Sequence, residues 1–195
     1  MYPLERIKGI ILPNGYEPSE GNLRIKSLEG RTRIDFKPEN RRFSDYDGII
    51  YGLLSRYLIE HQTSNVLDIG GGYKSTAVQE MMEQFPYLTA INIDLFAENT
   101  KFSRQGNANS LPVKDLSIDA VVSVHCVSRF LISLRPEGET MVKEMARVLK
   151  PDGLAFVWPG FDLTPISKDF EAATQLYGKN TYGLVYRKTH APYQS

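Results

Sequence analysis

Three consecutive glycines, Gly70, Gly71 and Gly72, interrupt the sequence "VLDIGGGYKST" directly after an apolar run that contains Asp68. Glycines lack side chains, so they let a backbone approach a ligand closely, and the start of a following helix carries partial positive charge. The types and spacing of these residues therefore predict a site for a polar ligand. Three ligands fit such a loop in principle.

A nucleoside triphosphate is the first, because "GGGYKST" superficially resembles a phosphate-binding P-loop. That motif needs one glycine immediately before the lysine and another five positions earlier. Around Lys74 those two positions hold Tyr73 and Asp68. Both requirements fail, so Lys74 and Ser75 are interpreted as a solvated side chain and the start of a helix.

A nicotinamide dinucleotide is the second, since Gly70, Gly72 and Ser75 satisfy the pattern G-x-G-x-x-small and Asp94 follows at about the distance of a ribose-binding acid. Asp68 argues against it, because a carboxylate beside a pyrophosphate would repel it. The position of Asp68 favours a ligand that carries an ammonium or another cationic group.

S-adenosylmethionine is the third ligand, and it has an ammonium group, a sulfonium, a ribose diol and an adenine. Asp94 can accept hydrogen bonds from a diol, and the amide of Asn107 can accept one from an adenine amine. Each also has a purely structural interpretation, as a residue of a turn.

Alternating strand and helix patterns position this loop. Strand patterns cover 65–69, 87–94, 118–126, 154–158 and 181–187, and helix patterns cover 44–61, 76–85, 141–149 and 167–177. Thr76 and Gln79 have the spacing of a capping box. This order predicts an α/β fold with a doubly wound, mostly parallel sheet, in which ligands bind at the carboxyl ends of the strands.

Two regions depart from a regular repeat of strand and helix. Residues 1–43 contain turn formers between short alternating runs, which predicts an arm or hairpin ahead of a single domain over 44–195. After Trp158 there is room for about one helix and one strand, so the sheet is expected to be one strand short at that end. Only one turn of helix at most fits between Asp94 and Gly106.

Composition excludes several classes of protein. Of 195 residues, 42% are hydrophobic and the formal net charge is zero, so neither nucleic acid nor an anionic membrane is an expected partner. Cys126 is the single cysteine, which excludes an internal disulfide, and the three histidines show no metal-ligand spacing. A cytoplasmic protein without a metal site is expected, and the oligomeric state stays open.

Four segments together resemble the class I S-adenosylmethionine-dependent methyltransferases over about 65–158. They are "VLDIGGG", "INID", "GNANSLP" followed by "SIDAVVSVHCV", and "EMARVLKPDGLAFV". The resemblance implies a Rossmann-like fold. It also implies that Asp68 and the backbone of the three glycines hold the methionine end of S-adenosylmethionine, that Asp94 binds the ribose, that Asn107 and Ala108 border the adenine, and that Ser123 lies at the cofactor site.

The predicted reaction is methyl transfer to an oxygen, nitrogen or carbon atom of a small organic acceptor. His125 is the candidate base, because it follows the fourth strand on the ligand side of the sheet and a neutral imidazole accepts a proton near pH 7. Arg129 either binds an anionic acceptor or caps a helix. The alternative function is a methyltransferase-like module that binds ligand or partner without turnover, which Lys74 and the short segment after Asp94 favour.

Overall fold

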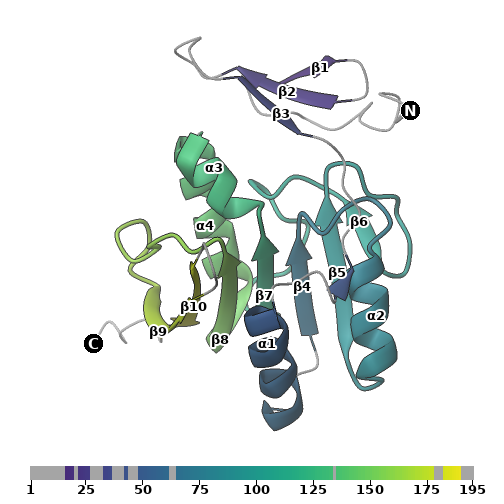
Figure 1. Cartoon of the computed structure of the whole chain (residues 1–195), viewed down its shortest axis with the longest axis vertical. Helices are drawn as coiled ribbons and strands as arrows, with labels where there is room; N and C mark the ends of the chain where they lie inside the picture. Colours follow the sequence, from purple (N-terminus) through teal and green to yellow (C-terminus); the bar gives the residue numbers. More distant parts are fainter. Residues whose placement is uncertain are drawn as a thin grey trace.

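The computed structural model of the chain contains one sheet of three strands and one of seven (Figure 1). It describes residues 16–19, 22–26, 33–36, 42–43, 48–61, 65–133, 135–177 and 182–189. The elements in chain order are β1 (Tyr16–Ser19), β2 (Asn22–Lys26), β3 (Arg33–Phe36), α1 (Gly48–His61), β4 (Asn65–Ile69), α2 (Thr76–Gln84), β5 (Thr89–Asp94), β6 (Ser103–Gln105), β7 (Ile118–Val124), α3 (Val127–Ser133), α4 (Arg135–Val148), β8 (Leu149–Trp158), β9 (Phe170–Tyr177) and β10 (Tyr182–Lys188).

The large sheet has the strand order β6-β5-β4-β7-β8-β10-β9. Five strands, β4 to β8, pair in parallel, whereas β10 runs antiparallel between β8 and β9. The chain starts this sheet at β4, goes outward to β6, then returns to the other side of β4. The strand order therefore reverses beside β4, where ligands bind in folds of this kind.

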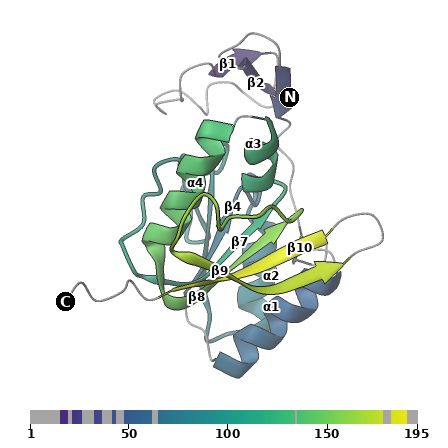
Figure 2. The same cartoon turned by 90° about the vertical axis from the view of Figure 1, so that its left-hand side faces the viewer.

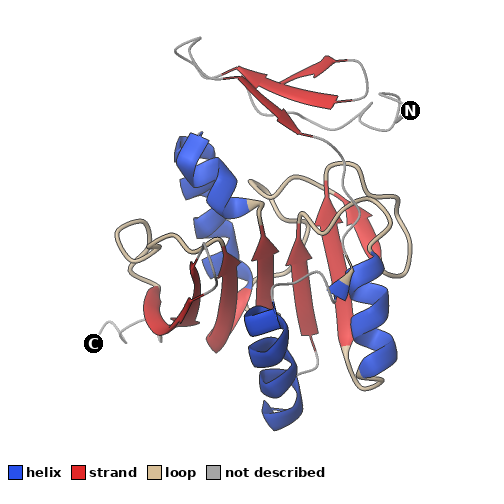
Figure 3. Ribbon diagram, viewed as in Figure 1, coloured by secondary structure: helices blue, strands red, loops and turns tan. Residues whose placement is uncertain are grey.

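Helices cover both faces of the sheet (Figures 2 and 3). Successive strand residues point to opposite faces, so in β7 Val122 packs with the α1 and α2 side chains whereas Val121 packs with those of α3 and α4. In β8, Phe156 packs on the side of α1 and α2, and Val157 packs on the side of α3 and α4. This double burial explains why these strands read as continuous apolar runs.

The predicted doubly wound α/β fold is confirmed, but the expected last helix is wrong. Residues Phe170–Tyr177 form strand β9, which pairs with β10. The segment is short, and its apolar residues fit helical spacing as well as strand spacing. Pairing with β10 decides between them, and it brings the Phe170 and Tyr186 rings to 6.0 Å between centroids. The sheet therefore ends in a complete antiparallel hairpin and is not one strand short.

The region between β5 and β7 agrees with the short spacing of the sequence. The described residues 95–102 contain turns and bends but no helix, and β6 has three residues. Residues 106–117 contain one isolated bridge, from Asn107 to Ser110, and otherwise irregular backbone. The carboxyl edge of the sheet is consequently bordered by loops on this side.

The small sheet is antiparallel, in the order β1-β2-β3. The sequence predicted an arm or hairpin near the N-terminus, and the antiparallel pairing of β2 with β3 agrees with the second alternative. In both views the small sheet lies beyond the carboxyl ends of the parallel strands (Figures 1 and 2). The division into an arm over 1–43 and a domain over 44–195 stays a prediction, and the proposed caps Asp45 and Asp47 lie outside the described residues.

Within the described part of the chain, the helices are too short or too polar to cross a membrane.

Candidate functional site

The glycine loop follows β4 at the carboxyl edge of the sheet. Gly70 and Gly72 have φ angles of 75° and 91°, a region that side chains disfavour. A Cβ atom added to Gly71 would lie 1.9 Å from Oδ2 of Asp68. Glycine is therefore required by backbone conformation at two of the three positions and by close packing at the other.

The three glycine N–H groups tie the loop to the neighbouring strand β5. They donate to the Ile93 carbonyl at 2.9 Å, to Asn92 Oδ1 at 3.0 Å and to Asp94 Oδ2 at 3.2 Å, in chain order. The glycine pattern predicted that the backbone of the loop approaches a ligand closely. In the structure these donors serve β5, so the glycines keep the loop thin and hold it beside Asp94.

Asn92 is the residue of this site that sequence reasoning missed. Its side chain is fully buried, and its Nδ2 donates to the Gly72 carbonyl at 2.7 Å and to Ser75 Oγ at 2.9 Å, while its Oδ1 accepts from Gly71. An amide in the middle of the apolar strand "INID" is the signal that could have found it, because buried amides need hydrogen-bond partners.

Asp94 ends β5 with both carboxylate oxygens oriented by backbone donors. Oδ2 accepts from Gly72 N–H at 3.2 Å, and Oδ1 accepts from Phe96 N–H at 2.7 Å. The two backbone donors fix the orientation of the carboxylate, and Asp94 is half-buried. Its role toward a ribose diol stays a prediction.

Asp68 lies directly beneath the loop. It is fully buried and faces Asn92 in the register of β4 and β5. The contact with Gly71 described above shows that its carboxylate points toward the loop rather than away from it. A buried carboxylate favours a cation over an anion in its surroundings. Its role toward the ammonium group of a ligand stays a prediction.

The first turn of α2 differs from the predicted capping box. The helix begins at Thr76, so its N-cap is Ser75, which has φ 54° and ψ 35° and whose hydroxyl accepts from Asn92. The Gln79 side chain donates to the Lys74 carbonyl at 2.8 Å, outside the pattern of a capping box. The predicted box took Thr76 as the N-cap, one residue too late, because Ser75 is the N-cap and its hydroxyl binds Asn92 instead of the helix.

Asn107 and Ala108 follow β6, close to Asp94. The Asp94 carbonyl accepts from Gly106 N–H at 3.2 Å, which places the start of this loop next to β5. Oδ1 of Asn107 accepts from Asn109 N–H at 2.9 Å, and Ala108 is buried. The Asn107 amide therefore organises a turn here, and its role toward adenine stays a prediction.

Ser123 and His125 lie at the end of β7. Ser123 is fully buried and its hydroxyl accepts from Val127 N–H at 3.0 Å, so it caps α3. His125 is exposed, has a φ of 56°, and donates its backbone N–H to the Trp158 carbonyl at 2.5 Å. Functional sites often hold residues in this sparsely populated conformation.

Cys126, which follows β7, packs closely against Gly70 of the glycine loop. A Cβ atom on Gly70 would lie 2.7 Å from both Cβ and Sγ of Cys126. The structure thus brings the ends of β4, β5 and β7 together at one edge of the sheet, with Asp68 in β4, Asp94 at the end of β5 and His125 directly after β7. Within the described ranges, no group of three or more His, Cys, Asp or Glu residues could hold a metal ion.

Comparisons with known proteins agree with this geometry. Residues 67–157 match a family model described as a methyltransferase domain. An uncharacterized methyltransferase-like protein of Schizosaccharomyces pombe is 29% identical over 144 residues, which cover 65% of this chain and 53% of the yeast protein. The chain spans about half the length of the curated relatives it matches.

Solved structures share the fold. A protein of Pyrococcus horikoshii superposes with a TM-score of 0.55 at 17% identity, covering 74% of this chain and 92% of that one. A candidate sarcosine dimethylglycine methyltransferase of Galdieria sulphuraria has a TM-score of 0.54 at 15% identity, covering 71% of this chain and 84% of that one. At such identities the likeness concerns the fold alone.

Proposed function

We propose that the chain is a class I S-adenosylmethionine-dependent methyltransferase, since residues 67–157 match a methyltransferase-domain model, and that it transfers the methyl group of S-adenosylmethionine to a small organic acceptor. One observation carries most of this proposal. The Asp94 carboxylate is oriented by two backbone N–H groups, beside a loop without side chains and at the strand-order reversal. A carboxylate held in a fixed orientation is a good acceptor for the hydroxyl groups of a ribose diol.

The residues around Asp94 fit the remaining parts of S-adenosylmethionine. Asp68 would favour the ammonium group of the methionine end electrostatically, through the thin glycine loop that lies between them. Asn107 and Ala108 would border the adenine, since Gly106 holds their loop against β5. Ser123 would support the cofactor site indirectly, because its hydroxyl binds the first N–H of α3 at the same edge of the sheet.

S-adenosylmethionine, when bound, supplies a methyl group that is already activated by its sulfonium. The protein's own part is to hold the acceptor in line with that methyl and to exclude water, and such orientation accounts for a large share of a rate enhancement. The hydrogen bonds of Asn92 and Asp94 suit this positioning role, because they hold β5, the glycine loop and the start of α2 in fixed places relative to one another.

His125 is the proposed base for acceptors that must lose a proton. It is exposed at the carboxyl end of β7, and the Trp158 carbonyl fixes its backbone. A His125→Asn variant tests this role, because asparagine tolerates the positive φ angle. With an acceptor that needs deprotonation, we expect turnover to fall roughly 100-fold or more while S-adenosylhomocysteine still binds.

Acceptor specificity would come from segments around this edge. The loop after β8 is held by Tyr186, whose hydroxyl donates to the Phe161 carbonyl at 2.6 Å and accepts from Leu163 N–H at 3.2 Å. The small sheet β1-β2-β3 lies on the same side (Figure 2). Both could cover an organic acceptor, as loops on a rigid scaffold often do.

Methyl transfer itself is tested by incubating the protein with labelled S-adenosylmethionine and a panel of small acceptors that carry hydroxyl, amine, thiol or carbon nucleophiles. Label in an acceptor product supports the proposal. If S-adenosylhomocysteine binds but no acceptor is labelled, the alternative function of a non-catalytic binding module is favoured. If neither occurs, the proposed function is wrong.

A further inference from the structure

The loop that would border the adenine lacks regular structure of its own. Residues 106–117, all of which the structure describes, connect β6 to β7 through turns and the one bridge from Asn107 to Ser110. A connection of this length without a helix depends on its neighbours for a defined conformation. The question is which side chains provide that support.

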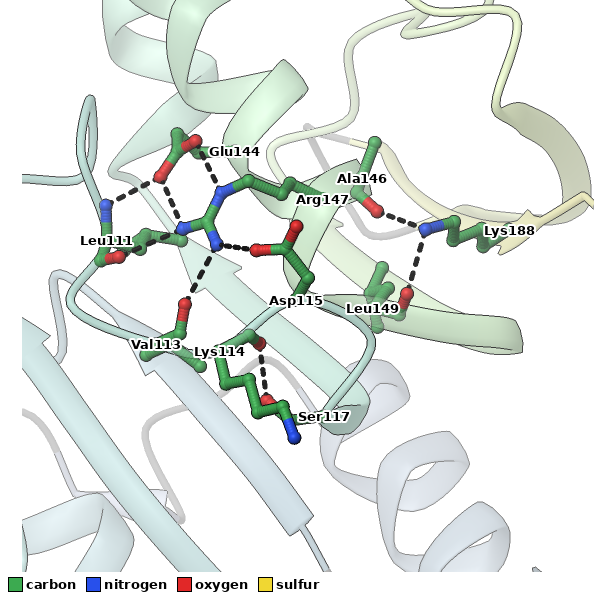
Figure 4. Close-up of polar contacts among 10 residues, drawn as sticks. All are labelled: Leu111, Val113, Lys114, Asp115, Ser117, Glu144, Ala146, Arg147, Leu149 and Lys188. Carbon is green, nitrogen blue, oxygen red and sulfur yellow. Dashed lines mark hydrogen bonds and ion pairs between the residues drawn. The ribbon is translucent and has the colours of Figure 1, made fainter. Parts of the chain in front are cut away.

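Arg147, in the last turn of α4, makes five hydrogen bonds through its guanidinium, three of them to this loop (Figure 4). Nε and Nη2 donate to the two carboxylate oxygens of Glu144, each at 2.8 Å. The other three bonds go to the Val113 and Leu111 carbonyls, both at 2.9 Å, and to Asp115 Oδ1 at 2.5 Å. Helix α4 is thereby attached to the loop at three residues.

Glu144, on the same helix, binds the loop as well. Its Oε2 accepts from Leu111 N–H at 2.7 Å, so the backbone N–H and carbonyl of Leu111 are both bound by the pair. The hydrogen bonds from Arg147 hold the pKa of Glu144 below its ordinary value, which keeps the carboxylate charged. The Leu111 side chain is buried in the same apolar cluster as Ala108.

Leu111 is joined to Asn107 by one tight turn. Ser110 N–H donates to the Asn107 carbonyl at 3.0 Å, and Asn109 N–H donates to Asn107 Oδ1 at 2.9 Å. The other end of the turn is held by the bond from Gly106 to the Asp94 carbonyl. The turn is thus fixed at both ends: Gly106 binds β5 before it, and Leu111 binds Glu144 and Arg147 of α4 after it.

We propose that Arg147 and Glu144 are positioning residues for the adenine end of the cofactor site. They set the place of the Asn107–Ser110 turn through both backbone groups of Leu111. This proposal rests on the proposed function, since it assumes that the turn borders adenine. It gives the arginine of the "RVLKPDG" segment an indirect part in cofactor binding, through the loop residues that it holds.

The test compares Arg147→Lys with Arg135→Lys in the full chain. Lysine keeps the charge but replaces a planar five-donor fork by a single ammonium, which cannot reach all the acceptors at once. Arg135 is the matched control, because it pairs with Glu139 at 2.8 Å on the same helix, on an exposed surface. Amide hydrogen exchange of 109–111 and calorimetric titration with S-adenosylhomocysteine are the two readouts.

We expect Arg147→Lys to speed exchange at 109–111 and to weaken S-adenosylhomocysteine binding at least tenfold, while Arg135→Lys changes neither. Glu144→Gln, which keeps one acceptor for Leu111, should give an intermediate loss and serves if Arg147→Lys does not fold. Faster exchange with unchanged affinity would overturn the proposal, as would unchanged exchange. If the unmodified protein does not bind S-adenosylhomocysteine, the proposed function fails first, and that result is distinct from a failure confined to the variants.

Discussion

The Asp94 carboxylate accepts a hydrogen bond of 3.2 Å from the Gly72 N–H group, so the acidic end of β5 and the glycine loop after β4 form one unit. The second oxygen of Asp94 is held by Phe96 N–H at 2.7 Å. If Asp94 binds the ribose as proposed, this fixed orientation reduces the entropy lost on binding.

Removal of the Asp94 carboxylate should weaken ligand binding. For Asp94→Ala we expect the affinity for S-adenosylhomocysteine to fall about tenfold or more, equivalent to roughly 1.4 kcal/mol, because charge-assisted hydrogen bonds to the ribose are lost. Asp94→Asn keeps one carbonyl oxygen and should lose less. Titration calorimetry measures both variants, and an unchanged affinity in Asp94→Ala would remove Asp94 from the site.

Two glycine substitutions should have opposite effects on stability. Gly71→Ala places a Cβ atom 1.9 Å from the Asp68 carboxylate, so we expect a loss of roughly 2 kcal/mol or more in the free energy of unfolding and a loss of ligand binding. Gly52→Ala lies on the exposed surface of α1, with nothing within 4 Å of the added atom.

Gly52→Ala should therefore stabilise the protein by about 0.5–1 kcal/mol, the usual difference between glycine and alanine inside a helix. Urea unfolding of the two variants measures this contrast. Equal effects of both substitutions would contradict the packing of Asp68 against the loop.

Replacement of Asn92 should destabilise the protein even when the new residue is aspartate, which has nearly the same shape. Asn92→Asp brings a second carboxylate beside Asp68 and removes the donor to Gly72 and Ser75, so we expect a greater loss of stability than in Asn92→Ala. Asn92→Ala leaves buried polar groups unpaired, which costs about 1–3 kcal/mol for each. Thermal unfolding measures both.

Asn99→Ala is the control for Asn92, because Asn99 makes an exposed hydrogen bond to Gln105 N–H and lies outside the loop. It should leave the melting temperature nearly unchanged. The account of Asn92 is wrong if Asn92→Asp melts at the temperature of the unmodified protein.

Glu144 should contribute an acid-sensitive part of the stability. Hydrogen bonding from Arg147 lowers the pKa of Glu144 in the folded chain below its ordinary value of 4.5. The stabilisation from this charge is therefore present above pH 4.5 and is lost as pH falls through the lowered pKa. Free energies of unfolding between pH 6 and pH 3 should converge for the unmodified protein and Glu144→Gln.

Glu139→Gln supplies the comparison, because Glu139 pairs with Arg135 on an exposed part of α4. Its difference from the unmodified protein should stay small across the same pH range. A constant gap between the unmodified protein and Glu144→Gln down to pH 3 would rule out the acid-sensitive contribution.

Strand-to-helix alternation predicted four of the five parallel strands, β4, β5, β7 and β8, because periodicity in 65–94 and 118–158 is strong. The three-residue strand β6 was not predicted. The segment 170–177 was misjudged, since eight residues of mixed character fit either period and only pairing with β10 decides. The position of the glycine loop and its neighbours Asp68 and Asp94 followed from sequence alone, because glycines after a buried strand have a narrow set of uses.

The internal support of the site could not be predicted. Asn92 and Arg147 act through hydrogen bonds to segments 17 to 36 residues away in the chain, as in the bonds from Asn92 to Ser75 and from Arg147 to Leu111. Patterns within a short window carry no information on such pairings. The use of the glycine N–H groups by β5 was hidden for the same reason.

The most direct test of the central assignment is calorimetric titration of the purified chain with S-adenosylhomocysteine, with NAD as the control ligand. The structure-based account predicts micromolar binding of S-adenosylhomocysteine, at one site per chain, and no binding of NAD, because Asp68 repels a pyrophosphate. Binding of NAD, or no heat with either ligand, would contradict the assignment of the loop from Gly70 to Gly72 as an S-adenosylmethionine site.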